Sequence, residues 1–390
     1  MDAYIVAASR SAVAKAKRGG FKNYRSDDLA VDIIKDLVSQ VEGLDTDTID
    51  DVIVGCANPE GEQGLQIGRQ IALRAVGKEV PGMTVNRYCA SGLETISIAS
   101  AKINAGMGEI YVAGGTESMS MIPMTGYKLA PSYNVAKHTP DYVVGMGITA
   151  EAVAQKYGIT REAADAFAVR SHERAAAAID GGLFEDEIHP VEVTEVFVED
   201  DKRQESSHTV AVDEGVRRGT SMEALARLRP AFKKGGIVTA GNSSQTSDGA
   251  AFVLVMSERM VKQLNLQPIA RLASCSVAGV EPLYMGIGPC AAIPKALKQA
   301  GIGIGDIDLT ELNEAFATQA LAVIEKAGLN IETTNVNGGA IALGHPLGCT
   351  GAKLSIQLFN EMRRRESKYG LVTACVGGGQ GIAGVYEFLN

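Results

Sequence analysis

The amino-acid sequence predicts an α/β protein that is built from two similar halves and interrupted by an inserted segment. Short apolar strands alternate with amphipathic helices in the first part of the chain, which is the pattern of an α/β fold. The C-terminal part returns to this pattern, and the composition changes between them. We therefore expect an N-terminal half over residues 1–118 plus 238–265, an insertion over 119–237, and a C-terminal half over 266–390.

The first half supplies clear strand and helix signals. The chain begins with Met1-Asp2-Ala3-Tyr4-Ile5-Val6, which predicts a first strand. Ser26-Asp27-Asp28 can cap a helix, because apolar residues then recur at i, i+4 and i+8 from Leu29 to Val41. Residues 51–55 and 109–114 predict two further strands.

The inserted segment is different in character. Its start is rich in methionine and proline, and an alanine-rich helix follows over 160–179, which Gly181-Gly182 should stop. The charged run at 199–203 predicts a solvated surface.

The last part of the chain repeats features of the first. Residues 307–311 resemble 49–53, and Val336-Asn337 resembles Val85-Asn86, each pair standing before a predicted helix. We expect 252–256 and 384–389 to close the two cores. This duplication predicts two similar α/β halves packed together.

Composition excludes several classes of protein. The chain has 390 residues and a net charge of −9, so it is a poor candidate for binding nucleic acid. No apolar run approaches the roughly 18 residues of a membrane span. Six scattered cysteines without a CxxC pair, and a start without the layout of a secretory signal, favour a cytoplasmic location. A transit peptide removed before residue 1 would leave no trace here.

Two residues stand where local structure favours reactivity. Cys89 follows a predicted strand end and precedes a helix, where the helix dipole stabilises a thiolate, although a cysteine there can also simply pack in the core. His345 precedes Pro346, which favours a position near a helix N-cap, where the dipole keeps the imidazole neutral. Flanking glycines would leave its ring accessible; the alternative is a histidine satisfied in a turn.

Two more candidates follow predicted strands. Cys375 precedes Gly377-Gly378-Gly379, whose backbone can approach a ligand and form an oxyanion hole. Asn313 could hold a catalytic water or simply cap a helix. The GxGxxG at 379–384 has too few residues after it for dinucleotide binding. We find no metal-ligand spacing, Walker loop or GxSxG elbow, and predict no metal.

Together these motifs resemble the thiolases over essentially the whole chain: VNRYCASG around Cys89, NEAFA around Asn313, GGAIALGHPLGCTGA around His345 and CVGGGQG around Cys375. The resemblance implies a duplicated αβαβα five-layer core, with the insertion as a loop domain covering the active site. It implies a homodimer or dimer of dimers, and thiolytic cleavage of a 3-ketoacyl-CoA by CoA through a Cys89 acyl-enzyme. No permanently bound cofactor is implied.

The resemblance also assigns roles. His345 would accept the Cys89 proton and Cys375 would act as acid and base. One oxyanion would bind His345 and a water on Asn313, and the other the backbone N–H groups of Cys89 and Gly377. Contacts with CoA would come from six residues: Met146, Arg217, Phe232, Ser244, Ala315 and Phe316.

Departures from the family bear on the substrate. Gly145 precedes Met146-Gly147 where short-chain biosynthetic members usually have histidine, and their basic tetramerisation signature is absent from 126–144. These features favour the degradative branch of the family, which acts in fatty-acid β-oxidation. We further expect that the protein can associate with other β-oxidation enzymes. The alternative is an acetoacetyl-CoA thiolase that works in the condensation direction. A ketoacyl synthase should have a second histidine in place of Asn313 or Cys375, and this chain does not.

Overall fold

The computed structural model describes residues 2–389, so Met1 and Asn390, where the predicted halves begin and end, lie outside it. Its strands form a mixed sheet in two parts, which meet where Ile5 of β1 pairs with Ala270 of β9. The N-terminal part has the order β4-β3-β5-β8-β1. Its strands are β1 (Ala3–Arg10), β3 (Asp51–Gly55), β4 (Gly82–Val85), β5 (Ile110–Ser118) and β8 (Ser247–Ser257), with the short β2 (Ala14–Lys15) beside β8.

The C-terminal part repeats this arrangement with the order β10-β11-β12-β9. In the first half β3 pairs with β5 in parallel, and β8 pairs with β5 in the antiparallel direction. In the second half β10 pairs with β11 in parallel, and β12 pairs with β11 in the antiparallel direction. A parallel bridge between Thr310 and Thr334 occupies the place that β4 has in the first half. The predicted duplication is therefore confirmed. The C-terminal strands are β9 (Ala270–Gly279), β10 (Leu309–Leu312), β11 (Tyr369–Val376) and β12 (Gln380–Phe388).

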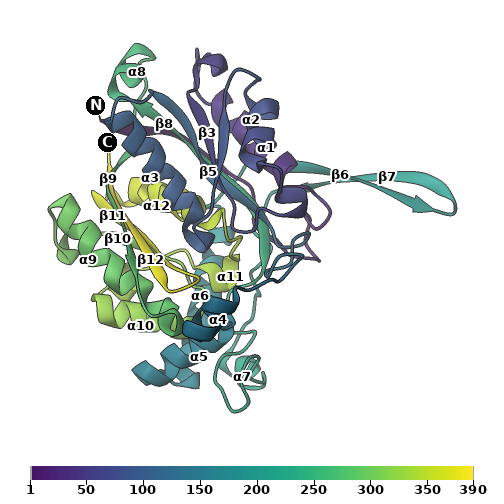
Figure 1. The fold of residues 1–390 in the computed structure, drawn as a ribbon, viewed down its shortest axis with the longest axis vertical. Coiled ribbons are helices and arrows are strands. Elements are labelled where there is room, and N and C mark those ends of the chain that lie inside the picture. The colour runs from purple at the N-terminus through teal and green to yellow at the C-terminus, as the bar shows by residue number, and fades with distance from the viewer. Residues whose placement is uncertain (1, 390) are drawn as a thin grey trace.

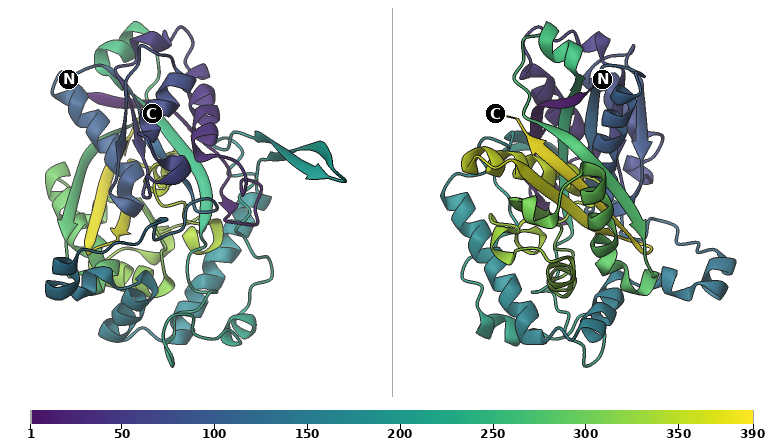
Figure 2. Two further views of the ribbon diagram at one scale, coloured as in Figure 1. Left: turned by 45° about the vertical axis from the view of Figure 1, so that its right-hand side comes forward. Right: turned by 90° about the vertical axis from the view of Figure 1, so that its left-hand side faces the viewer.

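Helices complete five layers, as Figures 1 and 2 show. The outer helices α1 (Ser26–Ser39) and α2 (Ile67–Ala75) cover the first part of the sheet. Between the two parts lie α3 (Ser91–Asn104) and α12 (Thr350–Arg365), whose apolar residues share one buried cluster with strands of both halves. The other outer layer is α9 (Gly288–Ala300) and α10 (Ala317–Ala327). The remaining helices of the halves are α8 (Glu258–Gln263) and α11 (Ala340–Leu343).

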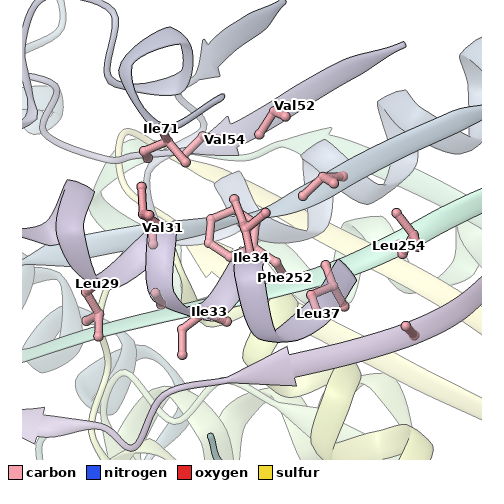
Figure 3. Packing of buried hydrophobic residues seen from close by; sticks show 14 of the residues in the cluster. Leu29, Val31, Ile33, Ile34, Leu37, Val52, Val54, Ile71, Phe252 and Leu254 are labelled. Atoms are coloured by element: carbon pink, nitrogen blue, oxygen red, sulfur yellow. The ribbon is translucent and has the colours of Figure 1, made fainter. Parts of the chain in front are cut away.

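Helix α1 shows how the sequence pattern becomes packing. Its apolar residues point at the sheet, so Leu29, Ile34 and Leu37 lie against Val52, Val54 and residues of β8 (Figure 3). The helix begins at Ser26, as expected, but the N-cap is Arg25 and no side chain caps it. The predicted Ser26 cap is wrong, because that residue already lies within the helix and its hydroxyl is buried.

The inserted segment contributes short helices and a two-stranded arm. The predicted helix is present as α6 (Arg161–Asp180), which ends before Gly181. Strands β6 (Val191–Glu199) and β7 (Lys202–Val210) pair as a hairpin that projects from the body (Figure 1), and the charged run forms its exposed tip. The other elements are α4 (Tyr133–His138), the 3-10 helix η4 (Pro140–Val143), α5 (Met146–Tyr157) and α7 (Met222–Ala226). Apolar residues of α6 and of the arm's base belong to the cores of the two halves.

Across residues 2–389, no helix combines the length and the apolar character needed to cross a membrane.

Candidate active site

Cys89 lies where the first half turns from sheet to central helix. Strand β4 ends at Val85, a 3-10 turn, η3 (Tyr88–Ala90), contains Cys89, and α3 begins at Ser91, as predicted. A Cβ on Gly92 would lie 2.7 Å from Ala352 N and 3.0 Å from Gly348 O, so this helix start packs directly on the segment after His345. The residue is partly exposed, but burial of its thiol raises the pKa to about 12, while the N–H groups of Gly377 and Cys89 lower it.

His345 lies between α11 and α12 and not at a helix start. The predicted N-cap position is wrong, because α12 begins only at Thr350, after a turn in which Pro346 O accepts from Thr350 N. The ring is also not accessible, since His345 is only 5% exposed. Burial, and then the positive charge of Lys353, lowers the pKa of His345 to about 3. The imidazole is therefore neutral near pH 7, but because of burial and not because of a helix dipole.

Hydrogen bonds fix the tautomer of this histidine. Thr350 Oγ1 donates to Pro346 O at 2.9 Å and lies 2.7 Å from His345 Nδ1. Because the hydroxyl proton is used on the carbonyl, Oγ1 must accept, and Nδ1 carries the hydrogen. Nε2 then carries the lone pair of the ring, and it accepts a hydrogen bond from Asn313 Nδ2 at 3.3 Å. A neutral imidazole with an available Nε2 can act as a general base.

Asn313 follows β10 and is held there by its backbone N–H, which donates to Thr373 O. It is not the cap of α10, whose N-cap is Phe316, so the capping alternative is wrong. Its Oδ1 is buried and has no hydrogen-bond partner among residues 2–389. A buried amide oxygen without a partner is costly, and a water or a substrate group would satisfy it.

Cys375 stands near the end of β11 and is buried. Burial raises the pKa of its thiol, and the nearby Cys89 raises it further. The chain then turns sharply, with φ of +81° at Gly378 and +86° at Gly379, values that favour glycine. Residues 380–388 form strand β12.

Five of the six residues predicted to contact CoA gather around Cys375. Met146 begins α5, and it packs with Ala315, Phe316 and Cys375 in one small apolar cluster. The rings of Phe232 and Phe316 meet edge to face at 6.0 Å. Ser244 N donates to Ala315 O at 3.0 Å. Arg217 lines a separate cavity of about 360 Å³ with His172 and Thr220.

Two residues that position the site escaped sequence reasoning. The buried carboxylate of Glu117 accepts from Gly348 N, Ala57 N and Gln63 Nε2, so it ties the loop after His345 to the loop after β3. A charged residue within the fully buried strand β5 is a signal that could have revealed it. Thr350 lies inside a recognised motif, but its bond to His345 depends on a turn that the sequence pattern does not specify.

Two neighbouring thiols and a buried, neutral histidine, on a duplicated α/β fold, define a site suited to thiol-dependent acyl transfer. The chain belongs to the thiolase family. Residues 3–259 match the thiolase N-terminal domain, and residues 266–388 match the thiolase C-terminal domain.

Individual relatives span nearly the whole chain. A protein of Bacillus subtilis named 3-ketoacyl-CoA thiolase is 52% identical over 99% of each chain. Among solved structures, human mitochondrial 3-ketoacyl-CoA thiolase is 40% identical with a TM-score of 0.89, covering 99% of each chain. The Bacillus anthracis acetyl-CoA acetyltransferase is 39% identical with a TM-score of 0.89, covering 100% of this chain and 99% of its own. The expected family and fold class are confirmed.

Proposed function

We propose that the protein is a 3-ketoacyl-CoA thiolase, which uses CoA to cleave a 3-ketoacyl-CoA into acetyl-CoA and a shortened acyl-CoA. The observation that carries this proposal is the pair of neighbouring thiols, Cys89 and Cys375, in a protein that also holds His345 buried and neutral. The reaction needs one nucleophile and a separate acid and base, and the two cysteines can divide these tasks. The Bacillus subtilis relative, similar over its full length, bears this name.

In the first step His345 Nε2 takes the Cys89 proton and the sulfur attacks the 3-keto carbon. The raised pKa of Cys89 favours removal of the proton as the carbon–sulfur bond forms, and not beforehand. Cleavage of the carbon–carbon bond leaves an acyl group on Cys89 and an enolate of acetyl-CoA. Cys375 protonates this enolate, and a thiol with a raised pKa holds the necessary proton.

In the second step Cys375 takes the proton of an incoming CoA, whose sulfur attacks the thioester. The released Cys89 sulfur recovers its proton from His345, which returns the site to its starting state. The N–H groups of Cys89 and Gly377, which lower the pKa of the Cys89 thiol, would stabilise one oxyanion. His345 and a water on Asn313 would stabilise the other, and the free Asn313 Oδ1 supports the water's position. The apolar cluster of Met146, Ala315 and Phe316 would hold the pantetheine arm of CoA.

A chain-length series tests the proposal. The purified protein is assayed with CoA and 3-ketoacyl-CoA substrates from acetoacetyl-CoA to 3-ketohexadecanoyl-CoA, and Cys89→Ala serves as the inactive control. We expect cleavage of the longer substrates as well as of acetoacetyl-CoA. Cleavage of acetoacetyl-CoA alone would favour the second candidate, an acetoacetyl-CoA thiolase acting in condensation, which the similarity to the Bacillus anthracis acetyltransferase supports.

We also propose a homodimer, as such or paired into a tetramer. Strand β4 lies at the edge of the sheet with half-buried Met83 and Val85, and Leu65 and Leu73 are exposed nearby, before and within α2. Light scattering should give at least twice the 40.9 kDa of one chain. The double variant Leu65→Glu, Leu73→Glu should have the light-scattering mass of a single chain. Ile304→Glu, at an exposed site in the C-terminal half, should keep the mass of the oligomer.

We also propose that the protein is located in the cytoplasm and associates with other β-oxidation enzymes. Cysteines at all six positions are free, which suits a reducing compartment and supports the cytoplasm. Association with other β-oxidation enzymes follows from the proposed reaction, because its 3-ketoacyl substrate must come from oxidation of a 3-hydroxyacyl-CoA.

A further inference from the structure

The residue before the nucleophile has an unusual backbone. Tyr88 has φ of +44°, a left-handed conformation that is rare for an aromatic residue. Hydrogen bonds hold it there: Tyr88 N donates to Asn86 Oδ1 at 2.8 Å, and Tyr88 O accepts from Ser91 Oγ at 2.7 Å. Tyr88 is 38% exposed, although Ala90 and Ser91, which follow Cys89, are buried. The chain therefore keeps a large ring beside Cys89 at a conformational cost.

A second tyrosine comes from the inserted segment. Tyr142, on η4, is 44% exposed, and its Cε2 lies 2.7 Å from where a Cβ on Gly378 would stand. Tyr88 Cδ2 lies 3.5 Å from the corresponding point on Gly377, and Met146 Sδ lies 3.8 Å from it. Tyr142 and burial raise the pKa of the Tyr88 phenol, and the adjacent Cys89 raises it further. Both rings lie over the glycine turn.

The side chains of Tyr88, Tyr142 and Met146 therefore lie together over the glycine turn that follows Cys375. The backbone N–H of Gly377 lowers the pKa of the Cys89 thiol, and the side chains of Tyr88 and Met146 lie over that glycine. The rings of Tyr88 and Tyr142 lie over the glycine turn, and both residues are partly exposed. Their faces therefore offer an apolar surface to an acyl chain that is longer than the acetyl group.

We propose that Tyr88 and Tyr142 form the binding surface for the acyl chain and set the preference of the enzyme for longer 3-ketoacyl-CoA substrates. This inference rests on the proposed thiolase function. It assigns the two residues to substrate specificity and not to the chemical steps, because neither is needed to move a proton in the reaction. The ring of Tyr142 should matter more than its hydroxyl, since the chain is apolar.

The test compares kcat/KM for 3-ketododecanoyl-CoA with that for acetoacetyl-CoA. Tyr142→Ala should lower this ratio about tenfold, which corresponds to lost contact with about two methylene groups. The change should lie mainly in KM for the longer substrate, because the contact is the same before and during reaction. Tyr142→Phe should keep the wild-type ratio, and Tyr88→Leu should lower it as Tyr142→Ala does.

Tyr133→Ala is the matched control, because Tyr133 is 74% exposed on α4 in the same inserted segment. It should leave the ratio unchanged. If Tyr142→Ala changes both substrates by one factor, or improves the longer one, the inference is wrong while the proposed function stands. If the wild-type protein cleaves no 3-ketoacyl-CoA, the proposed function itself is wrong.

Discussion

At the scale of single residues, the reactivity of Cys89 depends on a thiol that stays protonated at rest. Burial raises its pKa to about 12 and the pKa of His345 is lowered to about 3, so neither group is charged near pH 7. Only the thiolate reacts with an alkylating agent. The rate of Cys89 alkylation by iodoacetamide should therefore rise about tenfold per pH unit from 7 to 10, without a plateau.

Peptide mass spectrometry can follow this reaction at Cys89 separately from the other five cysteines. Acyl-CoA should protect Cys89, since the acyl-enzyme has no free thiol. A rate that levels off below pH 8 would mean that the thiolate already forms in the resting enzyme, and the concerted proton transfer proposed above would be wrong.

The two cysteines of the C-terminal motifs differ in what they can do. Cys375 lies against the cluster that includes Met146 and Phe316, whereas Cys349 is buried among the apolar residues of the central layer. Cys375→Ser should reduce kcat by about 10²- to 10⁴-fold, because a hydroxyl is a much weaker acid than a thiol. Cys349→Ser should affect stability more than kcat. Equal losses of kcat in the two variants would exclude the acid and base role of Cys375.

The sequence motifs predict which residues form the candidate site, but they do not predict the physical setting of those residues. Motifs with little freedom of spacing located Cys89, His345 and Cys375. The neutral state of His345 was predicted correctly for the wrong reason, because the helix begins at Thr350 and burial by distant segments provides the effect. The carboxylate of Glu117 accepts hydrogen bonds from Gly348 N and Ala57 N, which are far apart in the chain, and a local sequence pattern does not reveal such a contact.

At the scale of elements, the duplication could be predicted where both copies kept the same strand. The match of 49–53 with 307–311 corresponds to β3 and β10. The counterpart of β4 is reduced to one bridge at Thr334, two residues before the Val336-Asn337 pair that matches Val85-Asn86 at the end of β4. The arm was not predicted as a hairpin, because eight of the nine residues in β7 are exposed and no apolar alternation marks the strand.

The arm itself should contribute little to stability. Its base is anchored by buried Val191 and Val193, but most residues beyond them are exposed. Replacing residues 196–205 by an Asn-Gly turn should change the free energy of unfolding by less than about 0.5 kcal/mol. Val193→Ala should cost about 1.5–3 kcal/mol. Thermal denaturation followed by circular dichroism compares the stability of the two variants. If the truncation lowered the free energy of unfolding as much as Val193→Ala does, the tip would have to pack against another surface.

At the scale of the whole molecule, the central helical layer makes the two halves one folding unit. Leu93 on α3 lies close to Gly351 of α12 and Gly384 of β12, so a residue of the first half fills space in the second. The buried cluster there contains residues of both parts of the sheet. Neither half could keep this layer covered if the other unfolded, and exposure of so much apolar surface is unfavourable.

A substitution whose contacts lie in only one half can test whether the two halves unfold cooperatively. Leu37 is buried on α1 against the first part of the sheet, and Leu37→Ala should destabilise the protein by about 2–5 kcal/mol. If the shared layer couples the halves, amide hydrogen exchange should speed up by the same factor in β5 and in β11, although β11 lies in the other half. Leu129→Ala, at an exposed site, should change neither strand. Faster exchange in β5 alone would show that the first half opens independently, and that the central layer transmits less stability than its packing implies.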